Sequence, residues 1–337
     1  MKTIKVSSGE SEKRNLLLRQ TVNSEGLWND CRFVVNDKVE KCDWWFVLHG
    51  SGLINTESCL CDPEHIVYVS MEPSEEVSKA SGSFLGQFSK LLLCDRDIIH
   101  SNIDYLNGLT WWVGIVVQKK YGQHSFSFNH TLDYDRLTLL TPSKKKNRIS
   151  VILSKKDFLD GHKSRLDFLD KILDSPIAKY IDVFGHGFNP IPDKWDAIEP
   201  YKYHLVLENS VCQDYWSEKL ADAFLGFSLP IYFGCPNILD YFNKDSLVLI
   251  DINKFDESIE LIKTMLENGL YEERVDEINK ARGKVLNEFN IFNLMSKIAN
   301  SKALQLKKVT LHTNAFYKDS LIKKIVKIIL SKLKSLI

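Results

Sequence analysis

The sequence predicts an α/β protein of two Rossmann-like lobes that face a central cleft, followed by a basic amphipathic helix. Three observations lead to this prediction. Apolar runs of strand length alternate with loops and helical segments. The pattern restarts after a basic break at residues 141–148, TPSKKKNR, and residues 316–337 combine lysines with apolar residues at helical spacing. Continuously apolar strands separated by helices are typical of parallel sheets that are covered on both faces.

Length and composition agree with two domains. The chain has 337 residues, of which 44% are apolar and 26% charged, which is enough material for two ordinary cores. Lys+Arg and Asp+Glu both number 44, so the net charge of zero gives no global field that would favour nucleic acid as a partner. We expect an N-terminal lobe at residues 1–140, a second lobe at 149–300 and a basic tail at 301–337.

The cysteines and the N-terminus favour a reducing compartment. The seven cysteines are scattered, and Cys59 and Cys61 lack the second Cys or His pair that completes a zinc pattern. The first residues lack the apolar core of a secretory signal, and no apolar run reaches the ~18 residues of a membrane span. We therefore expect free thiols and a cytoplasmic location.

The strands of the first half end at residues that carry chemistry. Strands are predicted at residues 43–48, 66–71, 90–94 and 111–117. The first is followed by His49, and the second is closed by Glu72 and Pro73. Because parallel strands end at one edge of a sheet, these side chains are candidates for a site.

The second half repeats the strand–helix pattern more clearly. Strands are predicted at residues 149–154, 180–187, 203–210, 229–234 and 246–251. Helices are predicted to begin near Ser164, to cover residues 217–227, and to begin again near Asp256. This alternation predicts a second doubly wound unit, with its ligand at the carboxyl ends of the strands.

The most informative segment is residues 201–236, YKYHLVLENSVCQDYWSEKLADAFLGFSLPIYFGCP. The positions that carry a family pattern are Tyr201, Lys202, Tyr203, Glu208, Asn209, Ser210, Tyr215, Ser217, Glu218, Lys219, Pro230, Gly234 and Pro236. In this order and spacing they resemble the α-1,3/4-fucosyltransferases of glycosyltransferase family 10. The resemblance is specific over residues 149–260 and thins outside them.

The resemblance implies a GT-B fold and an inverting, metal-independent transfer of fucose from GDP-fucose to a glycan hydroxyl. It implies that the acceptor is a surface glycan of the lipopolysaccharide type and that no cofactor is needed. The donor-binding residues that it implies are Arg165, Asn209, Ser210, Tyr215, Glu218 and Lys219. Read without the resemblance, Glu218 fits a first-turn carboxylate, Asn209 and Ser210 fit a turn, and Tyr215 fits the core, so these alternatives stay open.

The chemistry of the donor agrees with these residue types. A departing diphosphate develops negative charge that the enzyme must neutralise. No Asp-x-Asp that could hold a divalent ion is placed at a predicted strand end. Lys219 and Arg165 are each expected in the first turn of a helix that follows a strand, where free amides and the positive end of the dipole can also face phosphate.

An inverting transfer also needs a base for the acceptor hydroxyl, and Glu72 is the best candidate. It matches a glutamate of the family in a similar strand–Glu–turn context, although Pro73 replaces the usual asparagine. Together with Glu218, it forms the expected catalytic pair. Glu75, Glu76 and His49 are the alternatives.

The tail has a helical pattern of its own. Its predicted apolar face contains Ile322, Ile325, Val326, Ile329, Leu333 and Leu336, opposite Lys323, Lys324, Lys327 and Lys334. This pattern predicts peripheral binding to the inner face of an anionic membrane. A helix docked on the N-terminal lobe is the alternative.

Two other functions remain open at this point. The same fold and family could use a different nucleotide sugar, because phosphate-binding residues do not report the stereochemistry of the sugar. A non-catalytic, glycan-binding relative is disfavoured because Arg165, Glu218 and Lys219 are all present.

Overall fold

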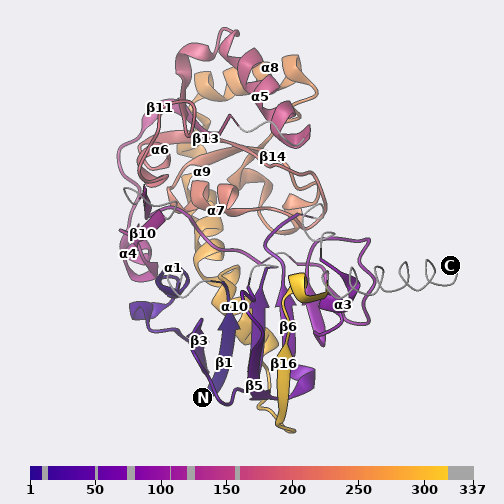
Figure 1. The fold of residues 1–337 in the computed structure, drawn as a ribbon. Coiled ribbons are helices and arrows are strands. Elements are labelled where there is room, and N and C mark those ends of the chain that lie inside the picture. The colour runs from indigo at the N-terminus through magenta and orange to yellow at the C-terminus, as the bar shows by residue number, and fades with distance from the viewer. Residues whose placement is uncertain are drawn as a thin grey trace, which may run out of the picture. The chain divides into compact units, whose positions relative to one another are not determined.

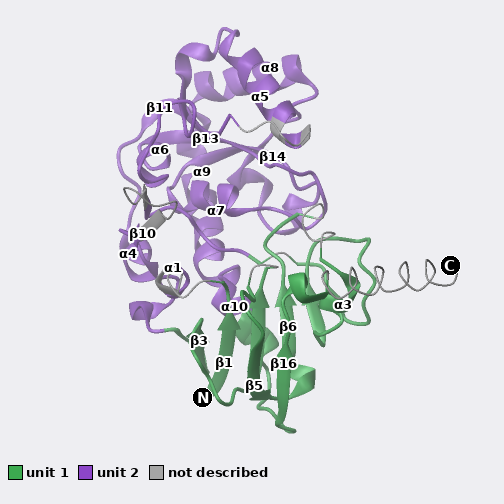
Figure 2. Ribbon diagram, viewed as in Figure 1, with its two compact units in different colours: residues 1–15, 26–108, 295–337 green, residues 16–25, 109–294 purple. Residues whose placement is uncertain are grey.

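The computed structural model describes residues 1–9, 14–49, 52–73, 80–106, 108–119, 126–155 and 160–317 (Figure 1). The chain divides into two compact units (Figure 2). Unit 1 contains residues 1–15, 26–108 and 295–337, and unit 2 contains residues 16–25 and 109–294. This division differs from the expected boundaries at 140, 149 and 300.

Unit 1 is built on a seven-stranded sheet with the order β2-β3-β1-β4-β6-β7-β8. The strands are β1 Lys2–Ser7, β2 Leu27–Trp28, β3 Cys31–Val35, β4 Trp44–Leu48, β6 Ile66–Val69, β7 Lys90–Leu92 and β8 Ile103–Asp104. All neighbours pair in parallel except β2 and β3. Strands β4 and β6 are buried along their whole length, as expected for the centre of a covered parallel sheet.

The C-terminal part of the chain contributes a strand to unit 1. Strand β16 (Lys307–Leu311) pairs antiparallel with β5 (Glu57–Cys61), so Val309 lies opposite Cys59. Part of the segment expected as a separate tail, 301–337, is therefore integrated into this unit. Residues 318–337, which hold most of the predicted membrane helix, lie outside the described residues, as do Glu75 and Glu76.

Unit 2 is built on a five-stranded parallel sheet with the order β12-β11-β13-β14-β15. The strands are β11 Lys146–Ile152, β12 Ile181–Phe184, β13 Tyr201–Leu207, β14 Leu229–Phe233 and β15 Val248–Leu249. The longer helices of unit 2 are α5 Asp160–Leu173, α7 Glu218–Leu225, α8 Phe255–Asn268 and α9 Leu270–Gly283, and α10 Ile291–Ile298 contains the boundary at which the chain passes to unit 1. A separate antiparallel pair is formed by β9 Ile115–Lys119 and β10 Phe126–His130.

Short elements complete the described chain. The short α-helices are α1 Arg14–Leu18, α3 Gly82–Leu85, α4 Tyr134–Leu139 and α6 Trp195–Ile198. The 3-10 turns are η2 Val22–Ser24, η3 Pro63–His65, η4 Ala178–Tyr180, η5 Ile238–Asp240 and η6 Lys244–Ser246, and Lys284–Glu288 forms a π-helical turn. No helix of the described residues is both long enough and apolar enough to cross a bilayer.

Three local predictions are corrected by the structure. The helix expected near Ser164 begins at Asp160. The strand expected at 111–117 begins at Ile115 and pairs antiparallel rather than joining a parallel sheet. The expected linker 141–148 lies inside unit 2, where the buried ammonium of Lys145 donates to the carbonyl of Gly226 at 2.7 Å. Basic residues at a composition break thus belong to the fold here.

The predicted α/β class is confirmed, because each unit is built on a sheet whose strands are parallel apart from the β2–β3 pair. The central strand of unit 2, β13, has the sequence YKYHLVL and is buried at six of its seven positions, which explains why most of its residues are apolar or aromatic. It carries the site at its C-terminal end.

Candidate functional site

The site is organised by a buried carboxylate directly after β13. Glu208 is 1% exposed, and its Oε1 accepts hydrogen bonds from the backbone N of Ser217 at 2.8 Å and from its hydroxyl at 2.9 Å. Its Oε2 accepts from the same hydroxyl at 2.7 Å. Glu208 therefore fixes the N-terminus of α7 against the end of β13.

Helix α7 begins with a capped first turn beside this carboxylate. Ser217 is the N-cap, and its hydroxyl accepts from the backbone N of Lys219 at 3.3 Å. The buried positions Leu220 to Leu225 hold the rest of the helix in the core of unit 2. The positive end of the helix dipole is thus held at the C-terminal edge of the sheet, where an anion is favoured.

Lys219 is held in place by the carboxylates around it. Its ammonium lies 3.0 Å from the Ser217 hydroxyl, 3.4 Å from Glu208 Oε2 and 3.6 Å from Glu218 Oε1. Burial alone would lower the pKa of Lys219, but the charges of Glu218 and Glu208 outweigh it and raise the pKa. The lysine is therefore charged and oriented, while its side chain is still 22% exposed.

Arg165 reaches the same edge from α5. Because α5 begins at Asp160, Arg165 lies in the second turn and not in the expected first turn. Its Nε donates to the carbonyl of Gly161 and its Nη1 to the carbonyl of Leu207, both at 3.2 Å. Burial lowers the pKa of this guanidinium, and the charge of Glu208 partly opposes that shift. The cation is therefore aimed at the end of β13.

Two glycines allow these segments to meet. A Cβ on Gly161 would lie 1.8 Å from the backbone oxygen of Asn209, so the first turn of α5 packs directly on the chain after β13. A Cβ on Gly234 would lie 2.5 Å from Cγ of Glu208, so the end of β14 needs glycine to leave room for that side chain. The sequence analysis included Gly234 in the family pattern but missed Gly161.

The residues directly after β13 include an unsatisfied acceptor. The side-chain Oδ1 of Asn209 is buried without a hydrogen-bond partner among the described residues. A buried acceptor of this kind is costly unless a ligand or water supplies a donor. Ser210 beside it is half-buried, and Tyr215 is 3% exposed, so its ring fits the core as well as the wall of a pocket.

Glu218 is held by two lysines, one of which the sequence analysis missed. Its Oε1 lies 3.4 Å from the ammonium of Lys194 and 3.6 Å from that of Lys219. Burial would raise the pKa of Glu218, but the charges of Lys219 and Lys194 outweigh it and lower the pKa to about 2. The carboxylate is therefore ionised throughout the physiological range. Lys194 also pairs with the buried Asp222 at 3.1 Å.

The base candidates lie in unit 1, at the ends of neighbouring parallel strands. Glu72 follows β6 and His49 follows β4, which pair in parallel. The hydroxyl of Ser70 donates to the backbone oxygen of Glu72 and accepts from its backbone N at 3.2 Å, which fixes the turn. His49 is in the left-handed region, with φ of 61°. Both side chains are half-buried.

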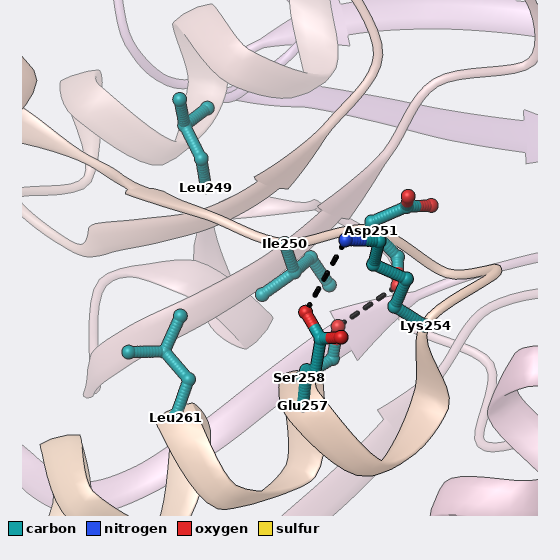
Figure 3. A pocket seen from close by; sticks show the side chains of 7 residues that line it. All are labelled: Leu249, Ile250, Asp251, Lys254, Glu257, Ser258 and Leu261. Carbon is teal, nitrogen blue, oxygen red and sulfur yellow. Dashed lines mark hydrogen bonds and ion pairs between the residues drawn. The ribbon is translucent and has the colours of Figure 1, made fainter.

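The described residues contain no cluster of three or more His, Cys, Asp or Glu side chains arranged to hold a metal ion. An open cavity of about 330 Å³ lies at the end of β15 (Figure 3). Its polar groups are partly paired with one another, Lys254 with Glu257 and Ser258 with the carbonyl of Asp251. None of the expected site residues lines it, so the charged cluster remains the candidate site.

The arrangement in unit 2 defines a class of protein. A parallel sheet whose central strand ends at a helix N-terminus, between an arginine and a lysine, has the organisation of a nucleotide-phosphate-binding unit. Residues 142–273 match the family model described as glycosyltransferase family 10 (fucosyltransferase), C-terminal part. The match confirms, for this part of the chain, the resemblance to glycosyltransferase family 10 that was predicted from the sequence. All the charged residues of the network in unit 2 lie within residues 142–273.

Named relatives match parts of the chain. The α-(1,3)-fucosyltransferase FucT of Helicobacter pylori is 37% identical over 78 residues, which are 23% of this chain and 16% of that protein. GDP-fucose protein O-fucosyltransferase 3 of Mus musculus is 28% identical over 198 residues, which are 48% of this chain and 41% of that protein. The chain thus spans less than half the length of these relatives.

Two solved structures align with most of this chain at low sequence identity. A crystal structure of an α1,3-fucosyltransferase with GDP-fucose covers 90% of this chain and 91% of its own, with 16% identity and a TM-score of 0.47. A structure of an α1,3-fucosyltransferase with GDP covers 85% of this chain and 90% of its own, with 17% identity and a TM-score of 0.48.

Proposed function

We propose that this chain is an inverting glycosyltransferase that moves fucose from GDP-fucose to a hydroxyl of a surface glycan. The observation that carries the proposal is the meeting of Arg165, Lys219 and the N-terminus of α7 at the end of β13. This set matches a diphosphate in charge and in hydrogen-bond donors. The family model over the same residues and the activities for which the relatives are named support fucose as the sugar.

Donor hydroxyls are assigned to the neighbouring polar groups. The unsatisfied Oδ1 of Asn209 accepts a hydrogen bond from a hydroxyl of the donor, with Ser210 and Tyr215 beside it. The ionised Glu218 binds sugar or ribose hydroxyls and stabilises the positive charge that develops at the sugar carbon. Because the leaving diphosphate meets fixed cations and a helix end, we propose that no metal ion or other cofactor is required.

Inversion in a single displacement requires a base from the acceptor side. We assign this role to Glu72, whose carboxylate takes the proton of the acceptor hydroxyl as the new glycosidic bond forms. The bond between fucose and the diphosphate breaks in the same step, and its electron pair leaves with GDP. His49 is the alternative base.

The cellular setting is also part of the proposal. Residues 316–337 would bind the cytoplasmic face of the membrane, where a lipid-linked glycan of the lipopolysaccharide type is assembled. Flotation with vesicles containing anionic lipid, at low and high salt, tests this part. Removal of residues 318–337 should abolish salt-sensitive flotation, and flotation equal to that of the full chain would contradict it.

The function is tested by turnover across a panel of nucleotide sugars. The purified chain is incubated with GDP-fucose, GDP-mannose and UDP-galactose, in excess chelator, with and without a glycan acceptor, and release of the nucleoside diphosphate is measured. We expect GDP release from GDP-fucose. Turnover of another donor would favour the alternative sugar, and binding of glycan without turnover of any donor would favour a non-catalytic relative. Activity that chelator removes and manganese restores would contradict metal independence.

A further inference from the structure

The side chain of Lys194 connects the site to a buried anchor. It precedes α6, and its ammonium lies 3.4 Å from Glu218 Oε1 and 3.1 Å from Asp222 Oδ2. Glu218 and Asp222 lie one turn apart on α7 and face the same way. Lys194 therefore bridges the partly exposed carboxylate of Glu218, at the start of the helix, and the buried carboxylate of Asp222.

Asp222 is a fixed partner for this lysine. It is 0% exposed, and its Oδ1 accepts from the backbone N of Trp112 at 2.9 Å and of Val113 at 3.1 Å. With one oxygen occupied by two amides, the other is held toward Lys194. A buried carboxylate of this kind needs a cation, and the cation in turn is held where it can reach Glu218.

We propose that Lys194 is a positioning residue of the transfer reaction, which holds the carboxylate of Glu218 in the orientation that serves the donor. This inference rests on the proposed function and deepens it. Lys219 already shares its ammonium among Ser217, Glu208 and Glu218, and an arriving diphosphate competes for it. Lys194 pairs with Glu218 from the side of α6, so it keeps the carboxylate in place when Lys219 turns to the phosphates.

The charged groups around Glu218 determine the pKa of its carboxyl group. They come from four segments: Lys219 and Asp222 on α7, Lys194 before α6, Glu208 after β13 and Arg165 on α5. Removal of Lys194 takes away one of the two cations that lower the pKa of Glu218 most, while the negative charges of Asp222 and Glu208 remain. The pKa of Glu218 in the variant should therefore rise from its value of about 2 toward the ordinary range.

The test compares Lys194→Met with Lys194→Arg and with Lys202→Met. Lys202 is a matched control because its side chain is 20% exposed, against 28% for Lys194, and it also pairs with a carboxylate, that of Glu272. It lies at the start of β13, whereas the site lies at the end of that strand. For each protein, kcat and KM for GDP-fucose, Kd for GDP, the melting temperature and the ¹³C-detected titration of the Glu218 carboxyl are measured.

We expect Lys194→Met to lower kcat by ~10-fold or more, because small displacements of a group that acts in the transition state cost rate rather than affinity. GDP affinity should stay within ~2-fold of the wild type, because Lys194 is not assigned to phosphate. Lys194→Arg should recover most of kcat, and Lys202→Met should match the wild type. The Glu218 carboxyl should titrate at higher pH in Lys194→Met alone.

Two outcomes would overturn the proposal. One is a Glu218 titration that is the same in Lys194→Met and in the wild type. The other is a loss of kcat that appears only with an equal loss of melting temperature and GDP affinity, which is the pattern of a purely structural lysine. Failure of the proposed function is seen separately, as absence of donor turnover by the wild type, and the titration then still decides whether Lys194 holds Glu218.

Discussion

The two sheets of this protein end in different kinds of polar edge. In unit 2, the strand β13 ends in a network in which Arg165, Lys219 and Lys194 alternate with Glu208, Glu218 and Asp222. In unit 1, β6 is followed by Glu72, whose backbone makes the hydrogen bonds with the Ser70 hydroxyl. The first edge fixes side chains through charge, and the second fixes a turn.

This difference teaches what each edge can contribute to a reaction. A network of paired charges is oriented before a ligand arrives, so it suits binding and electrostatic stabilisation. A carboxylate on a fixed turn suits proton transfer, which depends on its distance from one hydroxyl of the substrate. Removal of the cations of unit 2 that are assigned to the diphosphate should therefore weaken GDP binding, and a change of Glu72 in unit 1 should affect transfer alone.

The largest effect is expected in unit 1. Glu72→Gln should lower transfer by ~10³-fold or more, because the amide has the shape of the carboxylate but cannot accept the proton. GDP affinity should be unchanged, since the donor residues lie in unit 2. Fucose transfer and GDP titration on the same preparation provide the measurement, and near-normal turnover would move the assignment to His49 or Glu75.

A somewhat smaller effect is expected for the cations of unit 2. Arg165→Ala and Lys219→Ala should each lower kcat/KM by ~10²-fold or more and weaken GDP binding, because each removes a charge from the departing diphosphate. Lys171→Ala removes an exposed cation from the last turn of α5 and is the control. Equal kinetics in all three variants would show that the network serves stability rather than donor binding.

The strand–helix unit that carries this network could be predicted from the sequence. Strands β13 and β14 are rich in apolar and aromatic residues because both of their faces are buried. Ser217, followed by an acidic and a basic residue, marks the start of α7. The structure brings Arg165, Asn209, Glu218 and Lys219 together at one edge. Their roles in binding stay predictions.

Other parts could not be predicted because they depend on contacts between distant segments. Lys194 lies 24 residues before Glu218, and its pairing arises from the packing of α6 and α7. Gly161 is required by an approach of α5 to the chain after β13, which no local pattern encodes. The sequence WWVG was interpreted as part of a strand, whereas its amides at Trp112 and Val113 donate to Asp222.

The close approach at Gly161 gives a third prediction. Gly161→Ala should destabilise the protein by about 1–3 kcal/mol and weaken GDP binding, because its Cβ would displace the backbone of Asn209. Gly283→Ala is the control: Gly283 lies in α9, a Cβ there meets nothing within 4 Å, and the change should be neutral or stabilising by ~0.5–1 kcal/mol. Urea unfolding and GDP titration measure both effects. Equal stability of the two variants would contradict the packing described here.

The smallest effect is expected from a histidine beneath the site. His204 on β13 is buried and bonded to the Ser150 hydroxyl at 2.8 Å, and burial lowers its pKa from 6.5 to about 3. Between these values the unfolded chain binds a proton that the folded chain does not, so stability falls as the pH falls through this window. At pH 5 the loss should be ~2 kcal/mol.

His204→Gln should remove this part of the acid sensitivity. The measurement is urea unfolding at pH 7.5 and pH 5 for both proteins, with the variant losing less stability than the wild type between the two values. The same pH dependence in both proteins would contradict the assignment.

The central claim is that the charged edge of unit 2 binds the donor through its own cations. The most direct measurement is the equilibrium Kd for GDP in excess chelator, for the wild type, Arg165→Ala, Lys219→Ala and Lys171→Ala. We expect the wild type and Lys171→Ala to bind equally, and the other two to bind ~10-fold more weakly or worse, with melting temperatures that show them to be folded. Equal affinity in all four proteins, or binding by the wild type that appears only when a divalent ion is added, would contradict the claim.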